Sequence, residues 1–412
     1  MSWVDLARRG AGRDEMAGVF PWFREMDACA HDPVYHAEGS PWEHTARVAE
    51  ALEADPLFSA MTPDRQEVLR VAAWAHDIGK PGTTVIEEED GRIRVRQPGH
   101  AALGARMIWQ HLIDAGERAR FARDVHALVA WHMRPSHMVD EGPERTLNRA
   151  IRFSVEAGQG GWSELLALCE ADQNGRVSLS GGDKLVPIRL LRISLEELCD
   201  AHRTDLFSGP WPFETVGSRL RFLRGDVTAS PWFTPPGPTG SRVTILSGLP
   251  GSGKDRWLLE NRPDLPVVSL DRIRAEQGIG PTENQGRVLQ AGFEAARGHL
   301  RSGRDFAWNA TCLTRLTRQK IVGLSRDYDA HIEIVSLDVP ARVALERNRG
   351  RGDAALPDRI ISELALKREP PMAEEAHGIM SVDACGRLSF HHPSCVTERA
   401  PTRPEGTSPT PF

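Results

Sequence analysis

The chain of 412 residues has few of the features that would place it in a membrane or outside a cell. No apolar stretch approaches the roughly 20 residues that a membrane-spanning helix needs. The first residues, MSWVDLARRGAGRDEMAG, lack the apolar core of a secretory signal. The six cysteines are scattered without CxxC spacing, which argues against a disulfide framework and against a thiolate zinc site. We therefore expect a protein of the reducing cytoplasm with no membrane partner.

Basic charge is also in short supply, since 51 Lys and Arg stand against 57 Asp and Glu, for a net charge of −6. This balance disfavours non-specific coating of nucleic acid, which needs many basic groups, but it permits a local basic groove. With 40% hydrophobic and 26% charged residues, the composition is that of a globular protein. The length suits two domains with a linker, and it leaves the oligomeric state open.

The pattern of apolar residues changes along the chain and predicts the domain boundaries. Residues 16–205 repeat apolar positions at three- and four-residue spacing, which predicts an all-α domain interrupted by a small hairpin at residues 83–97. Residues 206–241 are rich in Pro, Gly and Trp and indicate a linker or a boundary-packing segment. Residues 242–396 alternate β-branched runs with helical stretches, which predicts an α/β domain with a parallel sheet. Residues 397–412 have little to bury and are predicted to be disordered. The strand candidates are residues 243–247, 266–270, 305–309 and 331–339.

A glycine-rich phosphate loop opens the α/β domain, after a predicted strand and before a predicted helix. In such a loop the backbone N–H groups, the helix N-terminus and a lysine ammonium hold the phosphates of a nucleoside triphosphate. Asp255 stands where Ser or Thr usually binds Mg²⁺, and a carboxylate there either ligates Mg²⁺ or repels the triphosphate. We favour ligation, and so ATP or GTP with Mg²⁺, because further kinase residues follow. The loop residues are Gly248, Gly251, Ser252, Gly253 and Lys254.

Those further residues begin at the end of the second predicted strand. Asp271 is placed to accept the proton of an attacking hydroxyl, and Arg274, one helical turn later, can hold a phosphate of the acceptor. Taken alone, this pair would be better explained as a helix-capping aspartate with an exposed arginine. The arginines Arg347, Arg349 and Arg351 alternate with glycine and indicate a lid over the transferring phosphoryl group rather than a solvated helix.

The first domain carries a His-Asp doublet, His76-Asp77, in the run AAWAHDIGKPG, and nine of the 15 histidines lie in the first 140 residues. Adjacent helical side chains point about 100° apart, so the doublet can hold one ion from two sides. Imidazole with carboxylate suits Mn²⁺, Fe²⁺, Co²⁺, Ni²⁺ or Zn²⁺, and such an ion lowers the pKa of its bound water. Lys80 can offset charge on a phosphoryl oxygen. His100 and His132 are candidates for a second metal or for the phosphate, His126 and His137 are weaker candidates, and we interpret His31, His36 and His111 as structural.

Residues 242–385 resemble the P-loop polynucleotide 5′-kinase family. The shared pattern is GxxGxGK, then Asp-x-x-Arg, then Asn-x-Thr, then an arginine-rich lid that ends in Pro-x-x-Ile. The resemblance implies that Asp271 is the general base, that Arg274 contacts the 3′-phosphate of the acceptor, and that a lid arginine acts at the ATP phosphates. Small-molecule kinases share the loop and the lid, so Asp271 and Arg274 are the specific part.

Residues 30–180 resemble the HD phosphohydrolase superfamily, through HT, HDIGKP, GHA, a late WH and EAD in this order. The resemblance implies an all-helical fold in which His100 and His132 bind a second metal or the phosphate, with Arg176 as a looser candidate for phosphate. HD domains with this run also occur appended to CCA-adding enzymes, but nothing in this chain resembles a nucleotidyltransferase. The metal ligands that the resemblance implies are His44, His76, Asp77 and Asp172.

The order of the two domains resembles the bacterial HD-Pnk end-healing enzymes. That resemblance implies a kinase for 5′-hydroxyl ends and a phosphohydrolase for 2′,3′-cyclic phosphates or 2′-phosphates. The substrate would be ends of RNA, with DNA as a further candidate, and a separate partner ligase would join the ends. Two alternatives stay open. One is a nucleoside or antibiotic kinase fused to a nucleotide phosphohydrolase. The other is a non-catalytic nucleotide sensor in which Asp255 marks a loop that binds without turnover.

Overall fold

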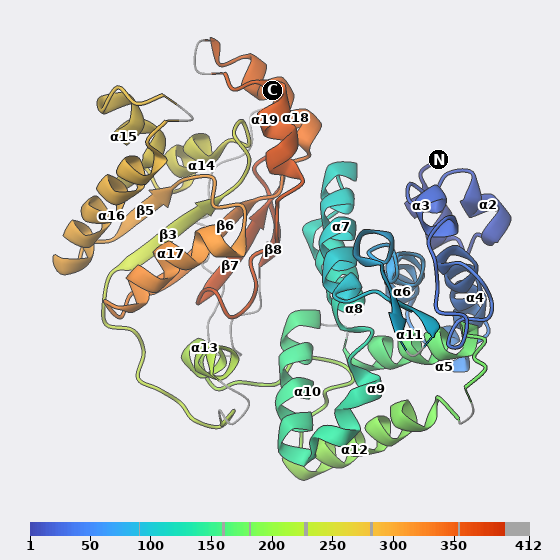
Figure 1. Ribbon diagram of the computed structural model, residues 1–412. Coiled ribbons are helices and arrows are strands. Elements are labelled where there is room, and N and C mark those ends of the chain that lie inside the picture. Colours follow the sequence, from blue (N-terminus) through green and yellow to red (C-terminus); the bar gives the residue numbers. More distant parts are fainter. Residues whose placement is uncertain are drawn as a thin grey trace.

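The computed structural model describes residues 1–391 except residues 90, 159–160, 181–182, 226–229, 281–282 and 353–354. It consists of a helical domain and an α/β domain that lie side by side (Figure 1). This confirms the predicted fold class of an all-α domain followed by an α/β domain with a mostly parallel sheet. Within the described residues, none of the helices combines the length and the apolar character that crossing a membrane requires. The tail predicted to be disordered lies outside the described residues.

The helical domain surrounds one large apolar core. Among its largest fully buried side chains are Trp42, Trp109 and Trp162. The core also takes in Trp3 and Val4, so the helical domain begins earlier than the predicted residue 16. Its helices are α1 (Trp3–Arg8), α2 (Arg13–Ala17), α3 (Phe23–Asp27), α4 (Pro41–Glu53), α5 (Pro56–Ser59), α6 (Pro63–Ala75), α7 (His100–Ala115), α8 (Ala119–Trp131), α9 (Pro135–Met138), α10 (Pro143–Ala157), α11 (Trp162–Gly175) and α12 (Val186–His202), with two 3₁₀ turns, η1 (Pro81–Thr83) and η2 (Val139–Glu141).

Local sequence explains where the site-bearing helices begin and end. The Ser40 side chain accepts a hydrogen bond from the N–H of Glu43, and Pro41 occupies the first turn, so α4 starts there. Helix α7 ends at Gly116, whose φ of 84° is left-handed and suits glycine. The predicted hairpin is present as the antiparallel pair β1 (Val85–Glu89) and β2 (Arg92–Arg96).

The α/β domain is built on a six-stranded sheet with the order β4-β5-β3-β6-β7-β8. The four predicted strands correspond to β3 (Arg242–Ser247), β4 (Val267–Ser269), β5 (Phe306–Asn309) and β6 (His331–Leu337), which all pair in parallel. Two strands were not predicted: β7 (Gly378–Val382), parallel to β6, and β8 (Leu388–His391), antiparallel to β7. The helices are α14 (Lys254–Asn261), α15 (Leu270–Glu276), α16 (Gln285–Arg301), α17 (Arg315–Arg326), α18 (Ala341–Arg349) and α19 (Asp358–Ala365).

Alternation along the central strand gives the sheet two covered faces. Val243 and Ile245 of β3 pack in one apolar cluster, whereas Leu246 packs in another with Trp257 and Leu258 of α14. Because the strands around β3 are parallel, the segments that follow them meet at one edge of the sheet. Ligands bind at this edge in open α/β sheets.

The segment of residues 206–241, predicted as a linker or boundary-packing segment, joins the two domains by packing. Its Trp211 and Phe213 belong to the core of the helical domain, and it contains the helix α13 (Val216–Arg224). Arg224 donates hydrogen bonds to the carbonyls of Glu374 and Glu375 in the α/β domain. The boundary-packing alternative of the prediction is therefore the one that describes this segment.

Direct contacts between the domains involve α7 and α8 on the helical side (Figure 1). Gln110 of α7 donates to the carbonyls of Leu366 and Arg368, and Arg123 of α8 donates to the carbonyl of Pro371. Helix α7 therefore connects the domain boundary, through Gln110, with the candidate metal site, through its first residue His100.

Candidate functional site

Five elements of the helical domain bring the predicted metal-site residues into one buried cluster. His44 lies on α4, His76 and Asp77 follow the end of α6, His100 begins α7, His132 follows the end of α8, and Asp172 lies on α11. None of the six residues is more than 8% exposed. The whole set that the sequence suggested is thus brought together, although these residues are up to 128 positions apart.

Asp77 is the centre of this cluster, and its two carboxylate oxygens face different histidines. Oδ2 lies 3.2 Å from His76 Nε2 and 3.8 Å from His44 Nε2. Oδ1 lies 3.4 Å from His100 Nε2 and 3.8 Å from His132 Nε2. Asp172 completes the first group, with Oδ1 2.8 Å from His44 Nε2. Asp77 is therefore placed to bridge two positions, one beside His44 and His76 and one beside His100 and His132.

Three of the histidines are held in the same way. Each has its Nδ1 near the backbone carbonyl three residues earlier, at 2.7 Å for His76, 2.8 Å for His100 and 2.8 Å for His132. A carbonyl only accepts, so Nδ1 carries the proton and donates, and Nε2 is left with a lone pair. All three Nε2 atoms point at the Asp77 carboxylate. Imidazoles fixed by their second nitrogen are typical of metal ligands.

Buried polar atoms support a metal beside these groups. In the part of the chain that the structure describes, the buried His76 Nε2 makes no hydrogen bond, and Asp77 Oδ2, 3.2 Å away, is paired with the Lys80 ammonium at 2.6 Å. Burying an imidazole nitrogen without a hydrogen bond is costly, and a cation shared with Asp77 would satisfy it. The donor set of imidazole and carboxylate fits a divalent transition metal.

The charges around the cluster keep its carboxylates ionised. Burial alone would raise the pKa of Asp77, but His76 and Lys80 outweigh burial and hold it well below its usual value. Burial likewise opposes ionisation of Asp172, yet Arg176 and His44 hold its pKa well below its usual value. Burial lowers the pKa of His132 to about 3, so its imidazole is neutral and able to bind a metal.

Two cations face the same cavity of about 260 Å³. Lys80 Nζ lies 2.6 Å from Asp77 Oδ2, and Arg176 Nη2 lies 3.3 Å from Asp172 Oδ2. Both therefore reach the edge of the metal cluster from the side open to a ligand. These positions suit the predicted roles at a phosphoryl oxygen.

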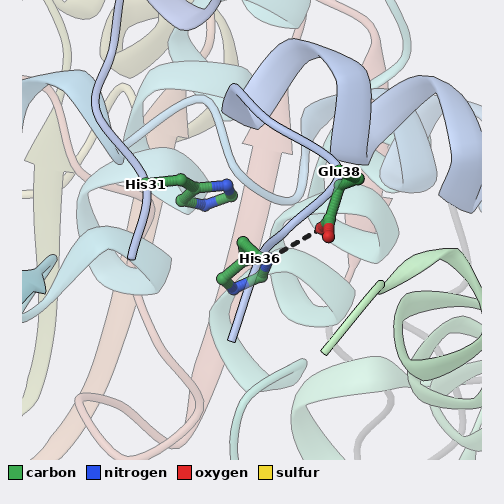
Figure 2. Close-up of side chains that lie close together, drawn as sticks. All are labelled: His31, His36 and Glu38. Carbon is green, nitrogen blue, oxygen red and sulfur yellow. Dashed lines mark hydrogen bonds and ion pairs between the residues drawn. The ribbon is translucent and has the colours of Figure 1, made fainter. Parts of the chain in front are cut away.

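Two histidines that the sequence suggested were structural also lie at this site, together with a glutamate that the sequence analysis missed. His31 and His36 stack with ring centroids 3.8 Å apart, and His36 Nδ1 lies 2.8 Å from Glu38 Oε1 (Figure 2). His31 Nε2 is 2.8 Å from Lys80 Nζ. His31 and His36, which the sequence analysis interpreted as structural, therefore lie against residues of the site. The run HAEG at residues 36–39, shortly before His44, was the sequence signal that could have pointed to these residues.

The remaining histidines divide as follows. His111 accepts a hydrogen bond from Trp3 Nε1 at 2.8 Å and packs against Trp22, so its interpretation as structural is correct. His137 lines a second cavity next to the metal cluster. Burial lowers the pKa of His126 to about 4. Among the described residues, His126 does not line either of the two cavities.

The phosphate loop follows β3 and depends on its glycines. Gly251 has a φ of 81°, and a Cβ atom there would meet the Ala344 carbonyl oxygen at 2.4 Å. Gly253 has a φ of 97° and directly precedes α14. A side chain at Gly248 would meet Ser252 Oγ at 2.6 Å. The backbone at this turn is therefore free to approach an anion at the N-terminus of α14.

Lys254 is held inside the loop in readiness for phosphate. Its Nζ donates to the carbonyls of Gly248 at 2.9 Å and Leu249 at 3.0 Å. Burial lowers its pKa to about 8, while the charges of Asp271 and Asp255 act in the opposite direction. The two aspartates thus lie close enough to be felt by the ammonium. Asp255 itself accepts a hydrogen bond from Asn309 Nδ2 at 2.6 Å, which fixes its carboxylate at the edge of the sheet.

Asp271 and Arg274 lie together on α15, immediately after β4. They form an ion pair, and Arg274 Nη2 also donates to Gln285 Oε1 at 2.9 Å. The Asp271 side chain is 77% exposed, whereas that of Arg274 is 19% exposed. The carboxylate is open to an incoming hydroxyl with its arginine beside it.

The predicted lid arginines lie at and after the end of α18. Arg347 donates to the carbonyl of Ser252 at 3.3 Å and so already contacts the phosphate loop. Arg349 pairs with Asp358 of α19, and Arg351 is exposed. The residues 353–354 that follow them lie outside the described residues. Arg347 therefore contacts the phosphate loop directly, and the charge of Arg351 reaches Lys254, whereas Arg349 is paired with Asp358.

Comparison with known proteins agrees with both halves of this description. Residues 42–155 match the HD domain family, and residues 243–371 match a family of AAA domains. The chain therefore joins a segment that matches the HD domain family to a segment with a phosphate loop that matches a family of AAA domains. Over 162 residues, which are 38% of its length, the chain is 32% identical to a multifunctional CCA protein of Ralstonia nicotianae. The match spans about a third of that relative, 34% of its length.

Solved structures similar to this chain include two kinases. A protein described as a kinase from Chloroflexus aurantiacus is 18% identical with a TM-score of 0.31, covering 36% of this chain and 87% of its own. A gluconokinase from Sinorhizobium meliloti is 18% identical with a TM-score of 0.27, covering 36% of this chain and 85% of its own.

Proposed function

We propose that this chain heals broken ends of RNA. The α/β domain phosphorylates a 5′-hydroxyl with ATP or GTP and Mg²⁺, and the HD domain hydrolyses a 2′,3′-cyclic phosphate or a 2′-phosphate. A separate ligase then joins the ends. The observation that carries this proposal is the presence in one chain of two separate phosphate sites. One has a metal-type His-Asp cluster, and the other has an acceptor pair, Asp271 and Arg274, beside its phosphate loop.

In the kinase step, the 5′-hydroxyl oxygen attacks the γ-phosphorus, its proton passes to Asp271, and the nucleoside diphosphate leaves. Asp271 is suited to this because its carboxylate is exposed at the end of β4 and its charge reaches Lys254. Arg274 then exchanges its contact with Asp271 for a phosphate of the acceptor strand. Lys254 and Arg347 neutralise the phosphates of the donor.

In the hydrolase step, water adds to phosphorus and one bond from phosphorus to a ribose oxygen breaks. A first hydrolysis opens the 2′,3′-cyclic phosphate to a 2′-phosphate and a 3′-hydroxyl, and a second hydrolysis releases inorganic phosphate and leaves the 2′-hydroxyl. His44, His76, Asp77 and Asp172 would hold a divalent metal, and such a metal would lower the pKa of a bound water and so supply hydroxide at neutral pH. Lys80 and Arg176 hold the phosphoryl oxygens from the open side of the cavity. His100 and His132 contact either a second metal or the phosphate.

Space for a nucleoside lies next to that phosphate position. A second cavity of about 280 Å³ shares His132, Asp172 and Arg176 with the first and continues past Lys184. Tyr35, one of only two tyrosines in the chain, lines both cavities with half of its surface exposed. An exposed aromatic ring and a lysine beside a phosphate site suit a stacked base and its neighbouring phosphate.

Mass spectrometry of one short RNA tests both steps together. The RNA carries a 5′-hydroxyl and a 2′,3′-cyclic phosphate and is incubated with the protein, ATP, Mg²⁺ and Mn²⁺. We expect one phosphate gained at the 5′ end and one lost from the 3′ end. An unchanged RNA, with ATP and metal bound, would rule out nucleic-acid ends as the substrate. Strong phosphorylation of free nucleosides would then indicate a small-molecule kinase, and no phosphoryl transfer at all would indicate a nucleotide sensor.

A further inference from the structure

We propose that Glu38, His36 and His31 form a positioning group for the HD site. In this group Glu38 orients His44 toward the metal, His36 links the other two residues, and His31 holds Lys80 toward the phosphoryl group. The inference rests on the proposed metal-dependent hydrolase, but it concerns residues that none of the predicted roles includes.

Glu38 lies behind His44, on the side away from Asp77. Its Oε1 is 2.9 Å from His44 Nδ1 and 2.8 Å from His36 Nδ1, and its Oε2 accepts the backbone N–H of Val177 at 2.8 Å. The Glu38 side chain is only 1% exposed. The Nδ1 of His44 meets this oxygen off the axis of a hydrogen bond, so charge rather than hydrogen-bond alignment dominates the contact. A carboxylate at this distance repels a lone pair, so it favours the proton on Nδ1. With a metal bound, the Nε2 lone pair would then face the ion together with Asp172 Oδ1, which lies 2.8 Å from Nε2.

This backing distinguishes His44 from the other histidines of the site. His76, His100 and His132 are each backed by a neutral backbone carbonyl. Within the described residues, only His44 among these four is backed by a charged group, and a carboxylate raises the basicity of an imidazole ligand.

Lys80 is held by the other end of the group. An ammonium only donates, so at 2.8 Å from Lys80 Nζ the His31 Nε2 accepts. Burial and the charge of Lys80 lower the pKa of His31 to about 2, which keeps His31 neutral and able to accept. The opposite neighbour of Lys80 Nζ is Asp77 Oδ2 at 2.6 Å. When a metal takes that oxygen, His31 remains as the acceptor that keeps Lys80 in the cavity.

The same three residues could be read as a metal site, since one ligand atom from each lies within 4.8 Å of the others. The stacking of the two rings argues against that. Their planes are 17° apart and their centroids 3.8 Å apart (Figure 2). Imidazole lone pairs lie in the ring plane, so two nearly parallel rings at this spacing do not aim at a common ion. Glu38 is also already engaged by two imidazoles and a backbone N–H.

Calorimetric titration of the full chain with Mn²⁺ tests the role of Glu38. Glu38→Gln keeps the shape and removes the charge, and we expect Mn²⁺ to bind about 10- to 100-fold more weakly. Glu43→Gln is the matched control, because Glu43 lies on α4 next to His44 but pairs with Arg13 at the surface, and it should bind Mn²⁺ normally. Glu38→Asp, which restores the charge, should recover part of the affinity. Unchanged Mn²⁺ affinity in Glu38→Gln, or no recovery in Glu38→Asp, would overturn the role of Glu38.

His31→Phe tests the other half, because it keeps the stack on His36 and removes the acceptor for Lys80. Inorganic phosphate should bind the Mn²⁺-loaded variant several-fold more weakly, while Mn²⁺ affinity stays at the parent value. Unchanged phosphate affinity, or an Mn²⁺ loss as large as in Glu38→Gln, would contradict the inference. ATP binding at the other domain reports that each variant is folded. Since no nucleic acid is used, failure here is distinct from failure of the proposed substrate.

Discussion

The two phosphate sites of this chain are built on opposite principles. The metal-site residues of the HD domain are at most 8% exposed, and the packing of several helices fixes them before any ligand arrives. At the proposed kinase site the side chains are more open, since that of Asp271 on a short helix is 77% exposed and that of Arg349, a predicted lid residue at a helix end, is 68% exposed. A metal site needs several ligands fixed at once, whereas a kinase site has to admit two substrates and then close over them.

The sharpest test of this comparison is that each site should fail alone. His76→Ala removes an imidazole from the metal cluster and should abolish phosphate removal while leaving the kinase at its normal rate. Lys254→Ala should reduce phosphoryl transfer by roughly 100- to 1000-fold, because a preorganised cation is lost from the phosphates, and leave the hydrolase intact. Both activities are measured on the same doubly modified RNA. Loss of both in either variant, with the fold intact by circular dichroism, would contradict the two-site description.

A smaller effect is expected from Gly251→Ala. The added Cβ would stand 2.4 Å from the Ala344 carbonyl on α18 and would force an alanine to a φ of 81°. We expect the phosphate loop and α18 to separate, with nucleotide affinity falling by at least 10-fold and stability by about 1–2 kcal/mol. The HD site, whose residues all lie in the helical domain, should keep its Mn²⁺ affinity. Gly323→Ala on α17 is the control, since a Cβ there meets nothing within 4 Å. Normal ATP binding by Gly251→Ala would refute the tight-turn argument.

Much of this comparison was predictable, and the part that was not has a physical reason. The phosphate loop and the His-Asp doublet are local patterns, so their residues and the strands β3, β4, β5 and β6 followed from spacing. Glu38 was missed and His31 was interpreted as structural because their partners, His44 and Lys80, are set by tertiary packing and not by spacing. Strands β7 and β8 were missed because their pairing with β6 and with each other is likewise set by tertiary packing.

The contact between the two regions offers a more modest test. Asp114, near the end of α7 in the HD domain, accepts the N–H of Ala341 at the start of α18 and pairs with Arg368 at 2.7 Å. Helix α18 carries Arg347 and so the arginine that touches the phosphate loop. Asp114→Ala removes a helix-capping acceptor worth about 1 kcal/mol, so we expect a several-fold loss of kinase activity without a change at the metal site. Glu117→Ala, which affects only Arg8 within the helical domain, should leave the kinase unchanged. Equal kinase activity in both variants would mean that the domains act independently.

The smallest expected effect concerns a carboxyl group between the two regions. Burial, reinforced by Glu374 of the α/β domain, raises the pKa of Glu156 on α10 from 4.5 to about 7. The folded state therefore binds a proton more tightly than the unfolded state, and the resulting stability is present below pH 4.5 and is lost as the pH rises toward 7. Glu156→Gln cannot titrate but can still accept from Trp131 Nε1, which lies 2.6 Å from Glu156 Oε2. The Tm of the variant should therefore gain on that of the parent between pH 5 and pH 8. Glu144→Gln, exposed in the first turn of the same helix, should show no such trend. A difference in Tm that stays constant between pH 5 and pH 8 would mean that Glu156 is ionised throughout this range. The boundary between the domains would then be polar enough to hold a charged carboxylate.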